Sequence, residues 1–146
     1  MTAVDTNILV YAHRLDSPWH DLAATTLRTL AEGPEPWAIP WPCVHEFFSI
    51  TTHPRIYKPP TPAALALADL ESWFESPSLR LIAETSRYWP VLRKVVESSA
   101  VVGPMVHDAR IAAICRAHGV TTLLSADRDF SRFGISVRNP LTTTLR

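Results

Sequence analysis

The sequence predicts an α/β fold built around a parallel β-sheet, and three observations indicate it. The chain has 146 residues, of which 47% are hydrophobic, enough for one buried core. Short apolar segments alternate with longer segments of helical periodicity, which is typical of a parallel sheet flanked by helices. Neither a repeat nor a shift in composition marks a second domain. We therefore expect residues 1–146 to form a single domain.

The first half of the chain is expected to contribute two strands and three helices. These are a strand at 2–6, helices at 7–14 and 17–32, a strand at 37–39 and a helix at 43–52, followed by a proline-rich loop at 53–60. Ser17 and Pro18 supply an N-cap and a proline at the first helical position, where proline is favoured. Val44, Phe47 and Phe48 share one face of the third helix, so that face should be packed.

The second half should add three helices and three strands. They are a helix after Thr61 and Pro62, a strand at 79–82, helices at 86–98 and from Gly103–Pro104 to His118, and strands at 122–125 and 135–137. The helix after Pro62 is amphipathic, and we expect Ala63, Leu67, Leu70, Trp73 and Phe74 to point inward. The helix ending at His118 is almost wholly apolar, and Gly119 suits its C′ position.

Composition excludes some classes of protein. No segment approaches the roughly 18 apolar residues of a membrane span, and the N-terminus lacks the pattern of a signal peptide. Cys43 and Cys115 have no zinc-type spacing, so we expect two reduced, buried thiols in a cytoplasmic protein. Fourteen basic and fourteen acidic side chains give zero net charge. This balance argues against a protein that coats nucleic acid but not against one that cuts it.

Acidic residues in apolar surroundings are the most informative feature of the chain. They are Asp5, Glu46, Asp108, Asp127 and Asp129. Carboxylates are rarely buried unless they are paired or bound to a metal. Asp5 and Asp127 both fall at the ends of expected strands, where open α/β sheets bind ligands. Oxygen ligands without a Cys or His set favour Mg²⁺ or Mn²⁺, so the pattern predicts a divalent metal site.

Each acidic residue also has an ordinary structural interpretation. Asp5 could cap the helix that follows it, and a lone helical glutamate such as Glu46 is usually solvated. Asp108 is favoured in the first turns of a helix by the helix dipole. Asp127 and Asp129 could both face the site if the backbone stays extended, or Asp129 could cap a short helix in a turn. Of these two, Asp127 is the stronger ligand candidate.

In four places the sequence resembles the acidic motifs of PIN-domain ribonucleases. These are the segment Val4–Leu9, the helical Glu46, the segment His107–Ala113 and the segment Leu124–Phe130. The motifs occur in the family's order and span nearly the whole chain. Length, the segment Thr52–Arg55 and the segment Asn139–Leu141 look most like VapC toxins of bacterial toxin–antitoxin pairs.

The resemblance implies a three-layer α/β/α sandwich with a central, mostly parallel sheet of about five strands. It also implies that Asp5, Glu46, Asp108 and Asp127, with Asp129 as a further candidate, hold one or two Mg²⁺ or Mn²⁺ ions for RNA hydrolysis. Supporting residues would be Thr6, Asn7 and Ser125. Candidate phosphate contacts, each of which could also be an ordinary surface cation, are Arg14, Arg55, Lys58, Arg110 and Arg128.

Two other functions compete with an endoribonuclease. A phosphatase of the haloacid dehalogenase type also begins with a strand-end Asp, but it needs a second Asp where this chain has Asn7. The other rival is a catalytically silent PIN-like module that binds RNA or protein. The intact acidic set argues against it, because an unused acidic cluster would only reduce stability.

Two kinds of protein partner are expected from the same resemblance. A VapC-type toxin would be held inactive by a small VapB-like antitoxin and would form a homodimer. Apolar side chains of the second and fourth helices exceed what one small core needs, and we expect some of them to form one of these surfaces. They are Trp19, Leu22, Leu27, Leu30, Leu67, Leu70, Trp73 and Phe74.

Overall fold

A five-stranded parallel sheet forms the centre of the computed structural model, which describes residues 1–142. The strands are β1 (Thr2–Val4), β2 (Trp37–Pro40), β3 (Leu79–Ile82), β4 (Thr122–Leu124) and β5 (Ser136–Arg138). Their order is β3-β2-β1-β4-β5, and every neighbouring pair is parallel. The expected parallel α/β sheet is confirmed. The last four residues of the expected single domain, 143–146, lie outside the described residues.

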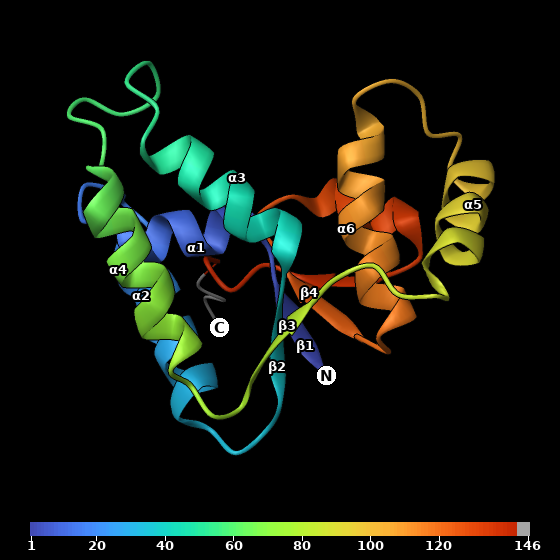
Figure 1. Cartoon of the computed structure of the whole chain (residues 1–146), viewed down its shortest axis with the longest axis horizontal. Coiled ribbons are helices and arrows are strands. Elements are labelled where there is room, and N and C mark those ends of the chain that lie inside the picture. Colours follow the sequence, from blue (N-terminus) through green and yellow to red (C-terminus); the bar gives the residue numbers. More distant parts are fainter. Residues whose placement is uncertain (143–146) are drawn as a thin grey trace.

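Helices cover both faces of this sheet, as Figure 1 shows. They are α1 (Thr6–His13), α2 (His20–Glu32), α3 (Trp41–Thr51), α4 (Ala63–Phe74), α5 (Tyr88–Ser98) and α6 (Met105–Ala117), with a 3₁₀ helix η1 (Arg128–Phe133). In Figure 1, α1, α2 and α4 lie on one side of the sheet, and α5 and α6 on the other. The three-layer α/β/α arrangement that the resemblance to PIN-domain ribonucleases implied is therefore confirmed.

The core lies where the central strands meet the helices packed on them. All four residues of β2 are buried, and the segment 111–115 of α6 is completely buried. A helix that is apolar on nearly all sides is expected only in a protein interior. The burial of this part of α6 agrees with the almost wholly apolar sequence of the helix. Gly119 has φ 73° directly after the helix, the left-handed conformation that glycine adopts without strain.

The inward face of α4 differs from the expected one. Ala66 and Leu70 are buried, whereas Ala63 is exposed and Leu67 is 49% exposed. Trp73 and Phe74 are partly buried and pack against the core. Nearly every residue from 63 to 70 is apolar, so periodicity could not single out one face. The prediction that Ala63 and Leu67 point inward was wrong.

The start of α2 is a second difference. The helix begins at His20, and Ser17 caps a turn before it instead of the helix itself. Ser17 Oγ accepts a hydrogen bond from Trp19 N at 3.1 Å, and Ser17 O accepts one from His20 N at 3.1 Å. The turn uses the same Ser-Pro signal that the sequence offered as a helix cap, which moves the helix start by about one turn.

Smaller expectations have mixed outcomes. Thr6 belongs to α1 instead of the first strand, α5 begins at Tyr88 instead of Ser86, and β5 is shifted by one residue. Cys43 and Cys115 are free and buried, as expected. Among residues 1–142, no helix is both long enough and apolar enough to cross a membrane.

Candidate active site

The carboxyl ends of β1 and β4 meet in the middle of the sheet. From β1 the chain enters α1 on one side, and from β4 it enters η1, which packs against α6 on the other side (Figure 1). Adjacent strands that lead to opposite faces form a topological switch point, where open α/β sheets place their ligand crevice. Asp5 follows β1 directly, and its amide donates to Leu124 O at 2.9 Å. The sheet topology therefore brings residues 5 and 125 together.

Asp5 is the most deeply buried carboxylate of the site, with 4% of its surface exposed. Its Oδ1 accepts from Thr6 N at 2.8 Å, and its Oδ2 accepts from Ser125 Oγ at 2.7 Å. It thus both ends a buried strand and caps α1, so the two interpretations of Asp5 are compatible. Each hydrogen bond satisfies an oxygen that burial has removed from water.

The protonation of Asp5 reflects this environment. Burial raises its pKa from 3.8 to about 6. Hydrogen bonds from Ser125 and Thr6 oppose the rise, while the negative charges of Glu46 and Asp108 add to it. A carboxyl that is desolvated and surrounded by like charges is one whose charged form needs a cation.

Glu46 reaches the site from α3. It is partly buried, and its Oε2 accepts a hydrogen bond from Thr6 Oγ1 at 2.8 Å. Thr6 is itself buried and follows Asp5 in the chain. The first turn of α1 therefore holds carboxylates from β1 and α3 together. Glu46 is not the freely solvated helical glutamate of the ordinary interpretation.

Asp108 lies in the first turn of α6, on the opposite face of the sheet from α1. Its side chain is partly buried. Burial raises its pKa, and the charges of Asp127 and Glu46 raise it further. The charges that raise the pKa of Asp108 therefore come from α3 and from the segment after β4.

Asp127 and Asp129 lie in the segment after β4, at the start of η1. Asp127 is the N-cap of η1, and its Oδ1 accepts from Asp129 N at 2.9 Å. Asp129 lies in the first turn of η1 and is exposed. The alternative of a turn with a short helix is therefore the correct one, but the capping residue is Asp127 and not Asp129. Asp127 is nearer to β4 in the chain than Asp129 and is partly buried.

Hydrogen bonds of Asn7 and Ser125 connect the start of α1 to the segment after β4. Asn7 Oδ1 accepts from Ala126 N at 3.2 Å, and Asn7 Nδ2 donates to Ser125 Oγ at 3.3 Å and to Asp5 Oδ2 at 3.5 Å. Ser125 is fully buried, and its Oγ also accepts from Asp127 N at 3.0 Å. The connection from β4 to η1 is thus fixed to the start of α1.

The five candidate phosphate contacts have different surroundings. Arg14 pairs with Asp16 and donates to Pro59 O at 3.0 Å, so it ties the proline-rich loop to the end of α1. Arg110 pairs with Glu84. The other three, Arg55, Lys58 and Arg128, are exposed. Their contact with a phosphate stays a prediction.

Two polar contacts of the site region were not foreseen. Cys43 Sγ lies 3.7 Å from Asp5 Oδ1, where it can donate a weak hydrogen bond. Its place three residues before Glu46 on one helix was the signal that sequence analysis overlooked. His13 of α1 contacts Asp69 Oδ2 of α4 through Nδ1 and Thr61 Oγ1 through Nε2. The His13 contacts join the last residue of α1 to α4 and to the segment before it, and no sequence motif predicts them.

The donor set fits a hard divalent cation. Asp5, Glu46, Asp108 and Asp127 offer carboxylate oxygens, which Mg²⁺ and Mn²⁺ prefer. Within residues 1–142, no three His, Cys, Asp or Glu side chains form a ready metal-binding cluster. The charges of Glu46 and Asp108 nevertheless raise the pKa of Asp5, and those of Asp127 and Glu46 raise the pKa of Asp108.

Comparison with known proteins agrees with this architecture. The model of the PIN domain family matches residues 2–135. The chain therefore belongs to the PIN-domain family.

Within that family the chain is similar to VapC ribonucleases. Ribonuclease VapC48 of Mycobacterium tuberculosis is 34% identical over 137 residues, which cover 93% of this chain and 94% of the relative.

Solved structures show the same fold. VapBC2 from Rickettsia felis, bound to a DNA fragment from its promoter, matches with a TM-score of 0.65 and 21% identity over 94% of this chain and 97% of the other. VapC20 of Mycobacterium tuberculosis, described as a toxin that cleaves the sarcin-ricin loop, matches with a TM-score of 0.63 and 18% identity over 92% and 96%.

Proposed function

We propose that this chain is a metal-dependent endoribonuclease and the toxin of a type II toxin–antitoxin pair, acting in the cytoplasm on cellular RNA. One observation carries the proposal. Hydrogen bonds join carboxyl-bearing residues from separate elements at the topological switch point. Thr6 donates through its N–H to Asp5 and through Oγ1 to Glu46, and Ser125 Oγ donates to Asp5 and accepts from Asp127 N. The negative charges of Glu46 and Asp108 also raise the pKa of Asp5. Relatives that share 32–34% of their residues with this chain are named ribonucleases, which supports RNA as the substrate.

The residues of the site have distinct roles in this proposal. One or two Mg²⁺ or Mn²⁺ ions would be held by Asp5, Glu46, Asp108 and Asp127, and Asp129 is a further candidate ligand. When bound, such a cation lowers the pKa of water and stabilises negative charge on the phosphate and the leaving oxygen.

The chain's own groups prepare the site for that chemistry. Ser125 and Thr6 N–H fix the two oxygens of Asp5, and Thr6 Oγ1 orients Glu46. Hydrogen bonds to ligating carboxylates keep them in place before the substrate arrives. Burial of Asp5 excludes water from its side of the crevice, which strengthens the attraction of the carboxylates for a cation. The braced and buried network favours catalysis over the silent-module alternative.

The proposal is tested by cleavage of total cellular RNA with purified protein. Discrete products are expected with Mg²⁺ or Mn²⁺, and none with EDTA or with the Asp5→Asn variant. Glu35→Gln, an exposed acidic residue in the loop before β2, is the matched control and should cleave like the wild type. Absence of cleavage by folded protein, together with absence of Mn²⁺ binding in calorimetry, would support the silent binding module instead.

An apolar groove between α3 and α4 is the candidate surface for an antitoxin. A groove of about 300 Å³ is lined by Val44, His45, Phe48, Leu67 and Leu70, and it is almost wholly apolar. We infer that an apolar segment of a VapB-like antitoxin packs there, because exposed apolar grooves of this kind mark protein contacts. Complex formation with a co-expressed antitoxin, and its loss on groove substitution, test the assignment.

A homodimer is the second expected assembly. Among the apolar residues that the sequence suggested for interfaces, Leu27 and Leu70 belong to the core. Trp19, just before α2, is 44% exposed, and Leu22 on α2 is 38% exposed. We propose that these exposed side chains, outside the α3–α4 groove, contribute to the contact between two copies. Analytical ultracentrifugation should find a dimer, and Trp19→Lys should shift it toward the monomer. A stable monomer at high concentration would contradict this assignment.

A further inference from the structure

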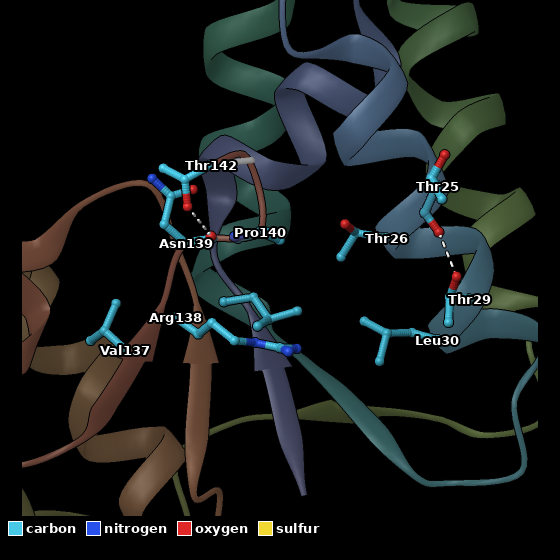
Figure 2. A pocket seen from close by; sticks show the side chains of 10 residues that line it. Thr25, Thr26, Thr29, Leu30, Val137, Arg138, Asn139, Pro140 and Thr142 are labelled. Carbon is cyan, nitrogen blue, oxygen red and sulfur yellow. Dashed lines mark hydrogen bonds between the residues drawn. The ribbon is translucent and has the colours of Figure 1, made fainter. Parts of the chain in front are cut away.

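A large pocket lies on the side of the sheet away from α6. It has a volume of about 640 Å³ and lies between α2, the ends of β4 and β5, and the segment after β5. Figure 2 shows Arg138 extending from β5 across this pocket toward α2, with Thr25, Thr26 and Thr29 on the opposite wall. Its size is in the range of pockets that hold small organic ligands.

The lining combines apolar and polar groups in a specific way. Leu30, Val137 and Pro140 supply apolar surface, and the buried Leu124 lies beneath them. The threonine hydroxyls on α2 are used as donors within the helix: Thr26 Oγ1 donates to Leu22 O at 2.8 Å, and Thr29 Oγ1 donates to Thr25 O at 2.9 Å. Because the single hydrogen of each hydroxyl is engaged, a ligand would meet these two oxygens as acceptors.

Positive charge distinguishes this pocket from the α3–α4 groove. Arg138 is exposed, and its guanidinium lies within the pocket (Figure 2). An arginine beside an apolar floor suits a ligand that carries both an anion and a flat ring. The α3–α4 groove has no such cation among its lining residues and is better suited to an apolar protein segment.

The pocket adjoins the acidic site through the backbone. Leu124, part of its floor, directly precedes Ser125, the hydrogen-bond partner of Asp5. Ser125 N donates to Arg138 O at 3.0 Å, so the strand that carries the arginine is fixed to the residue that orients Asp5. The acidic site and the pocket are therefore joined by a backbone hydrogen bond at the carboxyl ends of β4 and β5.

We propose that the pocket binds a nucleotide of single-stranded RNA that flanks the scissile phosphate, an inference that rests on the proposed ribonuclease function. Arg138 pairs with a backbone phosphate. The base packs on the apolar floor formed by Val137 and Pro140. The hydroxyl oxygen of Thr26 or of Thr29 accepts the hydrogen bond of the ribose 2′-OH, the group that distinguishes RNA from DNA.

Binding of a fluorescein-labelled single-stranded RNA of twelve nucleotides, followed by anisotropy, tests the assignment. Ca²⁺ replaces Mg²⁺, because it binds to the same kind of oxygen ligands, and gel analysis verifies that the RNA stays intact. Arg138→Gln should raise Kd by about threefold to tenfold and reduce the slope of log Kd against log salt by about 1. The control is Arg28→Gln, which removes the same charge from an exposed position on α2 outside the pocket and should change Kd less than about twofold.

A second variant and a mapping experiment guard against indirect effects. Thr29→Tyr places a bulky ring in the pocket from an exposed helix position and should weaken RNA binding without lowering the thermal unfolding midpoint. RNA that contains 4-thiouridine should cross-link, by mass spectrometry, to peptides that hold residues 25–30 or 137–142. The same sequence as DNA should bind more weakly.

The outcomes separate this inference from the function on which it rests. Equal effects of Arg138→Gln and Arg28→Gln, or cross-links only on other surfaces, would overturn it even if the protein cleaves RNA. Loss of antitoxin binding without loss of RNA binding in Arg138→Gln would assign the pocket to a protein partner instead. If the protein binds RNA through Arg138 but cleaves no RNA, the pocket remains an RNA-binding site and the proposed ribonuclease function is wrong.

Discussion

Ser125 and Asp5 are 120 positions apart in the sequence, yet Ser125 Oγ donates a 2.7 Å hydrogen bond to Asp5 Oδ2. Both side chains are buried, at the ends of the neighbouring strands β4 and β1. The bond stabilises the ionised form of Asp5 and so opposes the rise in pKa that burial causes. This contact favours the charged form of the most buried acidic group of the site and, together with the bond from Thr6 N, fixes its orientation.

Ser125→Ala should therefore weaken both cation binding and the fold. Asp5 Oδ2 would keep only the long contact from Asn7, and Asp127 N would lose its acceptor. We expect Mn²⁺ affinity to fall about 10-fold to 100-fold, and the free energy of unfolding to fall by about 1–3 kcal/mol. Calorimetry with Mn²⁺ and urea unfolding in EDTA measure the two effects. Ser136→Ala, at an exposed position on β5, should change neither, and unchanged Mn²⁺ affinity in Ser125→Ala would refute the orienting role.

Stability without a cation should fall as pH rises through the titration of Asp5. The pKa of Asp5 is about 6 in the folded chain and 3.8 when unperturbed, so the folded state binds the proton more tightly. Below about pH 4 the carboxyl is neutral in both states, and burial of its charge costs nothing. Above about pH 6 it is ionised in both, and the cost is on the order of 3 kcal/mol.

Urea unfolding in EDTA between pH 4 and pH 7 measures this dependence. In Asp5→Asn the decline between pH 4 and pH 6 should be much smaller, because the amide does not titrate. Glu35→Gln removes an exposed carboxyl and should keep the wild-type profile. The same decline in Asp5→Asn as in the wild type would show that other groups cause it, with Asp108, whose pKa is also raised, as the next to test.

The placement of Asp5 and Asp127 after strand ends was predictable from the sequence, whereas their role in a metal site stays a prediction. Asp5 and Asp127 come after apolar segments that can only be buried strands, and parallel topology brings such ends together. Asp108 was placed by the apolar character of the rest of its helix, which confines α6 to the interior. These inferences use the hydrophobic pattern and sheet topology, which are encoded locally along the chain.

Other features depended on contacts that no local pattern specifies. Whether Asp127 or Asp129 caps η1 is decided by a single backbone turn. The inward face of α4 could not be read because residues 63–70 are nearly all apolar, and packing against α3 decides that Leu67 faces the groove. The contact of Cys43 with Asp5 requires the relative placement of α3 and β1, which is a tertiary property.

Thr6 offers a test of how the site positions Glu46. Thr6→Val keeps the shape of this buried side chain but removes the hydroxyl that donates to Glu46 Oε2 at 2.8 Å. We expect Mn²⁺ affinity and RNA cleavage to fall about tenfold, whereas Thr6→Ser keeps the hydroxyl and should retain most of both. Calorimetry and cleavage at saturating Mn²⁺ separate binding from turnover. A Thr6→Ser variant as impaired as Thr6→Val would indicate that the methyl group's packing, and not the hydrogen bond, matters.

The α3–α4 groove leads to a prediction that separates antitoxin binding from catalysis. Leu67 and Leu65 are both exposed residues of α4, at 49% and 59%, but only Leu67 lines the groove with Val44 and Phe48. Leu65 faces a different pocket beside Pro59 and Pro62. Because a charge placed against an apolar partner surface must be desolvated without compensation, Leu67→Glu should weaken antitoxin binding by at least about 100-fold. Leu65→Glu adds the same charge to the same helix and should change the antitoxin affinity less than about threefold.

Calorimetric titration with the co-purified antitoxin measures the affinity of both variants. RNA cleavage by each free variant should equal that of the wild type, since α4 supplies no group to the acidic site. Equal antitoxin affinity in the two variants would move the partner surface away from this groove, and loss of cleavage in Leu67→Glu alone would show that α4 shapes the active site.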